Sequence, residues 1–238
     1  MKETYLGIHA STLTEAEMIE TIKQRVAQRE KTTVIAVNPE KVISAQSNET
    51  LKRLINTSTF QIPDGIGILL ASKLKKGKIR ARITGVDFML KLVELANDES
   101  YNVFLYGAKE EVVAKAKANL EKQYPNLNIV GYENGYCQDE AALVKKINDS
   151  HADMLFVAMG SPKQELWIER NMDKLCVKVF QGVGGSFDVL AGHVKRAPKF
   201  YRQLGIEWLY RLLSQPSRWR RQLALPKFLL KIVTERKA

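Results

Sequence analysis

The chain has 238 residues, of which 45% are hydrophobic and 26% charged, and it carries a formal net charge of +11. This composition is that of an ordinary soluble protein, long enough to bury one sizeable core. No stretch approaches the roughly 20 apolar residues that cross a bilayer, and the N-terminus shows no signal-peptide pattern.

Cysteine usage and the distribution of charge narrow the class further. Cys137 and Cys176 form no CxxC pair and only three histidines are present, which argues against a zinc site or a disulfide framework and for the reducing cytosol. Residues 195–238 hold twelve Lys or Arg and two Glu, so +10 of the net charge belongs to them and +1 to residues 1–194. We therefore expect a core (1–194), a basic appendage (195–238) and an anionic partner: nucleic acid, acidic lipid or a phosphorylated substrate.

The first part of the chain alternates short apolar runs with amphipathic ones. Strands are expected at 4–9, 33–37 and 60–62, and helices at 14–29, from Pro39 onward, at 66–71 and at 86–96. Asn38 suits a helix N-cap, with Pro39 at the first helical position. It also ends a strand, where ligands bind in open α/β sheets, so both roles stay open.

The stretch from Phe60 to Phe88 carries the strongest signal for a site. Asp64 follows a strand, and Gly65 and Gly67 remove side chains where a helix begins, so backbone N–H groups could approach an anion there. Arg82 lies 18 residues after Asp64. The pattern suggests a base paired with an anion clamp; the alternative is that Asp64 only caps the helix.

Further strands are expected at 102–107, 127–131, 153–160 and 177–181, and helices at 108–124, at 139–149 and through Ile168. Gly107 ends a strand and is compatible with a nearby phosphate or with a plain turn. Ser161 is expected to cap the helix that Pro162 opens, with Glu165 placed approximately where a capping box is closed. Capping leaves Lys163 and Gln164 unexplained.

The glycine-rich segment 182–188 has three glycines in four residues, so its backbone either turns tightly or lets a ligand approach. Strands that alternate with helices predict an α/β, Rossmann-like fold with a mainly parallel sheet and helices on both faces. Candidate residues then gather at one rim of the sheet: Asn38, Asp64, Gly107, 161–165 and 184–186. The absence of GxGxxG, Walker A and Asp-x-Asp patterns argues against NAD, ATP and a carboxylate-bridged Mg²⁺, and leaves a nucleotide diphosphate held by Arg, Lys and N–H groups.

The basic appendage reads as short amphipathic helices. Residues 201–213 predict one helix, and Pro216 and Pro226 are expected to break the segments that follow. Cations interleaved with Trp219 suit a membrane interface. The alternatives are a helical lid with a solvated basic face and, less favoured because the core has no basic stripe, nucleic-acid binding.

Six motifs stand out along the chain: Ile62-Pro63-Asp64-Gly65, Arg82-Ile83-Thr84-Gly85, Gly160 to Glu165, Gly182 to Phe187, Arg196-Ala197-Pro198 and Glu207 to Arg211. In their order and spacing they resemble the motifs of the WecG/TagA/CpsF glycosyltransferases, and the resemblance runs from about residue 4 to the C-terminus.

The resemblance implies an inverting, metal-independent transferase that needs no cofactor. In the wall teichoic acid branch of the family, N-acetylmannosamine passes from its UDP sugar to the GlcNAc of undecaprenyl-diphosphate-GlcNAc in a β-1,4 link. The appendage would dock on the inner face of the membrane and complete the site, so removing it should abolish transfer and leave a folded core. Another UDP sugar, such as a uronic acid or glucose, and a non-catalytic membrane-surface protein are the alternatives; whether the chain forms a homo-oligomer is left open.

Residue roles carry over position by position. Asp64 resembles the proposed base, and Arg82 and Gln164 line the pocket. The remaining expected substrate-binding residues are Asn38, Gly107, Lys163, Glu165, Gly184, Gly185, Ser186 and Arg196, with Arg211, Arg218 and Arg221 for a diphosphate. Ala36 departs from the family's frequent Thr, so one hydroxyl contact is in doubt.

Overall fold

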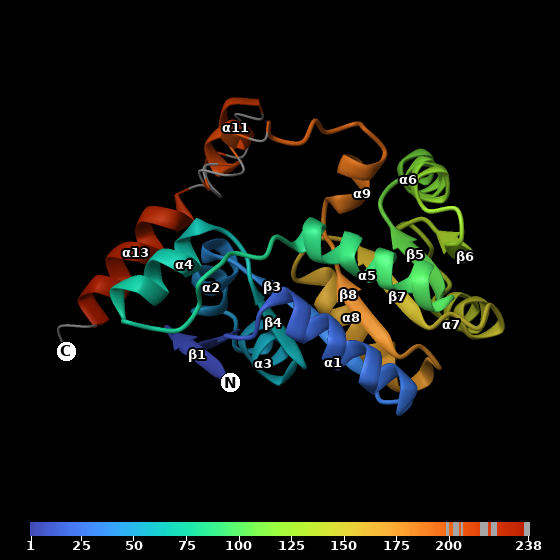
Figure 1. The fold of residues 1–238 in the computed structure, drawn as a ribbon, viewed down its shortest axis with the longest axis horizontal. Coiled ribbons are helices and arrows are strands. Elements are labelled where there is room, and N and C mark those ends of the chain that lie inside the picture. Colours follow the sequence, from blue (N-terminus) through green and yellow to red (C-terminus); the bar gives the residue numbers. More distant parts are fainter. Residues whose placement is uncertain (199, 202–204, 206, 215–218, 220–222, 236–238) are drawn as a thin grey trace.

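A six-stranded parallel sheet forms the centre of the molecule (Figure 1). The computed structural model describes residues 1–198, 200–201, 205, 207–214, 219 and 223–235. The strand order of this sheet is β4–β3–β8–β7–β5–β6, and every neighbouring pair is parallel. The strands are β3 (Thr32–Val37), β4 (Phe60–Pro63), β5 (Asn102–Gly107), β6 (Asn128–Glu133), β7 (Met154–Ala158) and β8 (Val179–Gly182). The predicted α/β, Rossmann-like class is confirmed.

Helices cover both faces of this sheet, because the side chains of each strand alternate between the faces. One face carries α1 (Glu15–Ala27), α5 (Gly85–Glu99), α6 (Glu110–Gln123) and α9 (Ser186–Leu190). The other carries α2 (Pro39–Ala45), α3 (Glu49–Thr57), α4 (Ile66–Leu74), α7 (Glu140–Asp149) and α8 (Lys163–Asn171), which a 3-10 turn (Met172–Lys174) follows.

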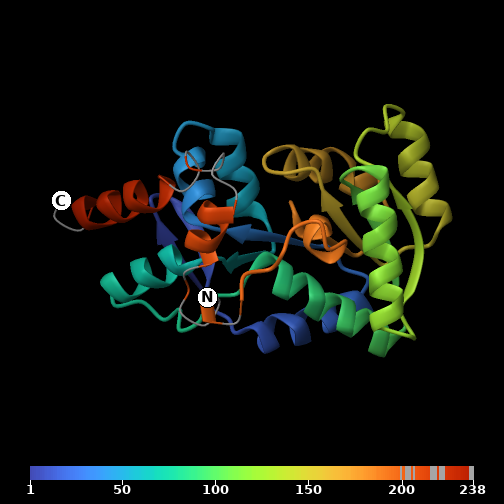
Figure 2. The same cartoon turned by 90° about the horizontal axis from the view of Figure 1, so that it is seen from above.

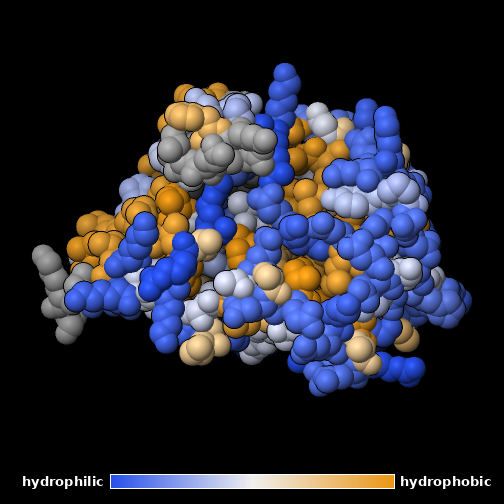
Figure 3. All heavy atoms as spheres, in the orientation of Figure 1, coloured by the Kyte–Doolittle hydropathy of each residue, from blue (hydrophilic) through white to orange (hydrophobic). Residues whose placement is uncertain are grey.

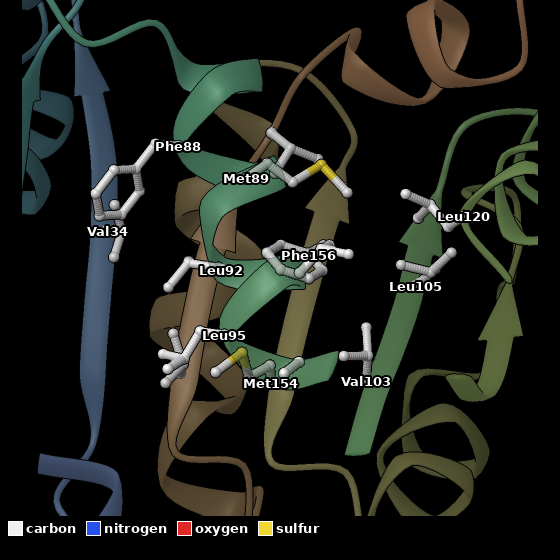
Figure 4. Packing of buried hydrophobic residues seen from close by; sticks show 14 of the residues in the cluster. Val34, Phe88, Met89, Leu92, Leu95, Val103, Leu105, Leu120, Met154 and Phe156 are labelled. Atoms are coloured by element: carbon white, nitrogen blue, oxygen red, sulfur yellow. The ribbon is translucent and has the colours of Figure 1, made fainter. Parts of the chain in front are cut away.

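A large part of the core lies under α5. Its buried residues Phe88, Met89 and Leu92 face the sheet, where they meet side chains of β3, β5 and β7 (Figure 4). Burial of one such side chain contributes about 1.5–3 kcal/mol. The sheet is therefore held firmly at the point where α5 starts, beside Arg82.

The chain reverses its direction of winding between β3 and β8. It leaves β3 for α2, whose Val42 packs on the same face as Val37. It leaves the neighbouring β8 for α9, whose Phe187 packs on the opposite face. Adjacent strands whose helices go to opposite faces leave a crevice at their carboxyl ends, which is the usual ligand position in open α/β sheets.

Two local expectations in the core are wrong. Residues 4–9 belong to an antiparallel hairpin of β1 (Lys2–Tyr5) and β2 (Ile8–Ser11), because Leu6 and Gly7 take positive φ angles and reverse the chain. Ser161 does not cap α8: the N-cap is Pro162, no side chain caps it, and Glu165 is buried instead of closing a capping box.

The appendage contributes α11 (Glu207–Ser214) and α13 (Ala224–Glu235). The expectation that Pro226 breaks the segment is wrong: Pro226 lies in the first turn of α13, where its missing N–H would have no partner in the helix. Phe228 and Ile232 of α13 are fully buried against α2 and α4. A Cβ on Gly67 would clash with Pro39 and Leu225, so this glycine permits the close packing of the three helices. Figure 2 shows α11 between α13 and α9.

Candidate active site

A cavity of about 550 Å³ lies at the carboxyl ends of β3, β4, β7 and β8, at the point where the winding reverses. The structure brings seven of the predicted site residues into its wall: Asn38, Asp64, Arg82, Gln164, Gly184, Gly185 and Ser186. Ala36 lines it too. The appendage closes one side with Glu207, Trp208, Ala224 and Leu225.

Asp64 follows β4 directly, and its backbone N–H donates to the carbonyl of Val37 on β3 at 2.8 Å. The N-cap of α4 is Gly65 and no side chain caps that helix, so the interpretation of Asp64 as a cap is wrong. Asn38 does cap α2: its Oδ1 accepts from the N–H of Lys41 at 2.9 Å. Both residues lie on the cavity wall, and Asn38 serves the helix as well.

Arg82 joins the core to the appendage. The loop that carries it is tied beside Asp64, since the N–H of Ile83 donates to the carbonyl of Pro63 at 2.9 Å. The guanidinium Nη1 of Arg82 lies 3.8 Å from the Glu207 carboxylate at the start of α11. The cation of Arg82 and the carboxylate of Asp64 thus share one wall, an arrangement that could remove a proton beside a developing negative charge.

Gln164, which lines the cavity, and Glu165 are both buried at the start of α8. The Nζ of Lys41 lies 2.7 Å from Oε1 of Glu165, and Gln164 donates to the same oxygen at 3.1 Å. Burial alone would raise the pKa of Glu165, but the charge and hydrogen bond of Lys41, with the bond from Gln164, hold this pKa below its ordinary value. Glu165 is therefore an ionised, buried carboxylate.

This arrangement predicts a pH dependence of stability with a defined sign. Because the folded protein lowers the pKa of Glu165, the carboxylate stabilises the fold fully above the ordinary pKa of about 4.3, and the contribution is lost as the pH falls through the lowered value. The Tm difference between wild type and Glu165→Gln should shrink from about pH 6 to about pH 3. A difference that stays constant over this range would contradict the assignment.

Four predicted site residues do not line the cavity: Gly107, Lys163, Glu165 and Arg196. Gly107 packs against the backbone of Ala158, and Lys163 is exposed. Arg196 forms an ion pair with Asp87. The side chain of Arg211, and Arg218 and Arg221 as a whole, fall outside the described residues, so their roles stay predictions.

Sequence reasoning assigned no site role to several residues of the wall, among them Lys41, Asp188 and Glu207. The carboxylate of Asp188 has no hydrogen-bond or ion-pair partner among the described residues. Its place at the end of the glycine-rich segment was the available signal, because that segment turns at the rim. That Lys41 and Glu207 line the cavity can be recognised only from the positions of α2 and α11 in the structure.

A model of the glycosyl transferase WecG/TagA/CpsF family matches residues 3–238. The chain belongs to this family. It is 38% identical over 215 residues to the N-acetylglucosaminyldiphosphoundecaprenol N-acetyl-beta-D-mannosaminyltransferase of Bacillus subtilis. This alignment covers 90% of this chain and 84% of that protein. The protein of the same name from Bacillus spizizenii is also 38% identical, covering 86% and 80%. The resemblance drawn from six motifs is thereby confirmed, and five of those motifs supply half of the residues that line the cavity.

Proposed function

We propose that this chain transfers N-acetylmannosamine from UDP-N-acetylmannosamine to the GlcNAc of undecaprenyl-diphosphate-GlcNAc, with inversion and a β-1,4 link, in the synthesis of the wall teichoic acid linkage unit. The observation that carries the proposal is the cavity with Asp64 and Arg82 in a chain that aligns over most of its length with two relatives of that activity.

The chemistry assigns one role to each charge. Asp64 takes the proton from the acceptor hydroxyl as the oxygen attacks the anomeric carbon of the donor. The bond between that carbon and the diphosphate oxygen breaks, and UDP leaves with the electron pair. Arg82 offsets the growing negative charge, together with Arg211, Arg218 and Arg221 of the appendage.

The cavity wall from α11 and α13 supports an appendage that helps to exclude water from the donor sugar. We expect the reaction to proceed without a metal ion, because arginines supply the positive charge that a metal would otherwise provide.

The appendage also supports a position on the inner face of the cell membrane. No helix in the described part of the chain combines the length and apolar character that a bilayer span requires. Apolar side chains gather over α13 and α4 (Figure 3), where the exposed members are Leu70, Leu74, Leu230 and Val233. Exposed lysines lie on the same two helices, and each contributes about 1 kcal/mol near an anionic leaflet.

The membrane proposal predicts the effect of charge on this surface. Leu230→Glu/Val233→Glu should lower binding to phosphatidylglycerol-containing vesicles roughly tenfold or more, because two inserted aliphatic side chains are lost. Co-sedimentation measures it. Tyr136→Glu is the matched control, since Tyr136 is 71% exposed in the segment between β6 and α7. Equal losses in both variants would contradict a specific surface.

The deciding assay is UDP release from UDP-N-acetylmannosamine in EDTA, with and without a lipid-diphosphate-GlcNAc acceptor. Acceptor-dependent release supports the proposed reaction and its independence from metal. If wild type gives none, UDP-glucose and the UDP-uronic acid are the next donors, and failure with all of them favours a non-catalytic membrane-surface protein.

A further inference from the structure

A series of polar contacts along the cavity wall links α2 to the glycine-rich segment. Lys41 of α2 lies 2.7 Å from Oε1 of Glu165, and the Nε2 of Gln164 donates to the same Oε1 at 3.1 Å. The Oε1 of Gln164 then accepts the backbone N–H of Gly184 at 3.0 Å. These contacts therefore span the crevice at the carboxyl ends of β3 and β8.

Each contact fixes the direction of the next. The carboxylate of Glu165 accepts hydrogen bonds and donates none, so the amide of Gln164 must point its NH₂ group at Glu165. Its oxygen is then directed at Gly184, the only arrangement that satisfies both neighbours. A Cβ on Gly182 would clash with the Gln164 amide, so a glycine at this position gives the amide its space.

We propose that Lys41 and Glu165 are positioning residues that orient the Gln164 amide and, through it, hold the Gly182–Ser186 turn at the cavity wall. This inference rests on the proposed function and adds residues to it. Two nearly buried charges cost desolvation, and apolar residues of similar size often serve stability as well. The pair therefore matters here for the direction that it gives to Gln164.

The turn that is held carries part of the wall. Gly184, Gly185 and Ser186 line the cavity, and Asp188 follows on the next turn. Gly184 has a φ of +53°. Its N–H bond to Gln164 is the side-chain contact that ties this turn to α8, since the Ser186 hydroxyl donates within the turn, to Val183 at 2.7 Å. Loss of orientation at Gln164 should thus displace wall residues without removing any of them.

A double-mutant cycle on the full chain tests the coupling. Glu165→Gln should lower kcat/KM about 10–30-fold and Gln164→Met at least as much. The double variant should lie within about threefold of Gln164→Met, because Glu165 acts through that amide. Losses that multiply, or an unchanged kcat/KM in Glu165→Gln, would overturn the proposal.

Stability is separated from positioning by two further variants. Lys41→Met/Glu165→Gln removes both charges, and it should regain Tm relative to Lys41→Met while its kcat/KM stays low. Glu169→Gln is the matched control: it removes an exposed ion pair with Arg53 one turn later on α8 and should leave kcat/KM unchanged. Recovery of kcat/KM together with Tm would show a purely structural role.

A readout without substrate keeps this inference distinct from the proposed reaction. Amide hydrogen exchange of the peptide that covers Gly182–Ser186 should accelerate in Glu165→Gln and stay at the wild-type rate in Glu169→Gln. If wild type shows no transferase activity but exchange changes as expected, the positioning network stands and the assigned reaction fails. Unchanged exchange in Glu165→Gln overturns the network whatever the activity.

Discussion

Asp64→Asn should lower acceptor-dependent transfer roughly 10³-fold, the range that a positioned general base contributes. The variant keeps the shape of the side chain and the backbone bond from Asp64 to Val37, and Asp64 caps no helix, so the fold should persist. Initial rates of UDP release at saturating donor measure the effect, and UDP binding by calorimetry should change less than about threefold.

Asp188→Asn is the matched control for this experiment. Asp188 is a second carboxylate on the same cavity wall, it comes from α9 on the other side of the crevice, and it has no partner among the described residues. We expect a loss of less than about tenfold, because a carboxylate that only accepts bonds from substrate hydroxyls is replaced by an amide that accepts them too. The reverse ranking of the two variants would assign the base to Asp188.

The sequence was sufficient to locate the rim of the site. Asn38, Asp64 and Gly184–Ser186 each follow a strand, and parallel strands present their carboxyl ends at one edge, so these residues had to share it. Gly107 obeys the same rule but does not line the cavity, because β5 is separated by β7 from the point where the winding reverses between β3 and β8. The strand order therefore determines which strand ends line the cavity, and no local sequence pattern encodes the strand order.

Contacts between elements distant in sequence could not be predicted from spacing. Glu165, four residues after Ser161, fits the three-residue spacing of a capping box only approximately, and the placement of α2 shows that Lys41 holds it instead. The amphipathic pattern of α13 was readable, but not that Phe228 would pack in the core cluster of α2 and α4. An apolar stripe says that a face is buried and leaves its partner unspecified.

Deletion of residues 195–238 should abolish transfer, since Glu207, Trp208, Ala224 and Leu225 form one side of the cavity. The sequence alone suggested that the remaining core would stay folded. The structure leads us to expect a core of reduced stability, because the deletion uncovers the apolar faces of α2 and α4 that Phe228 and Ile232 bury. Loss of activity in the deletion could then come from the missing side of the cavity or from the weakened core, so a second variant is needed to separate these two causes.

Phe228→Ala provides that variant. It leaves every residue of the cavity wall in place and removes a fully buried side chain, so the free energy of unfolding should fall by about 3–5 kcal/mol in urea titrations. Leu230→Ala, two residues on in the same helix at 67% exposed, is the control and should stay within about 0.5 kcal/mol of wild type. If α13 must be docked for the wall to close, Phe228→Ala should also lose transfer at temperatures where the core remains folded. Full activity in that variant would show that the appendage completes the site without docking on α2 and α4.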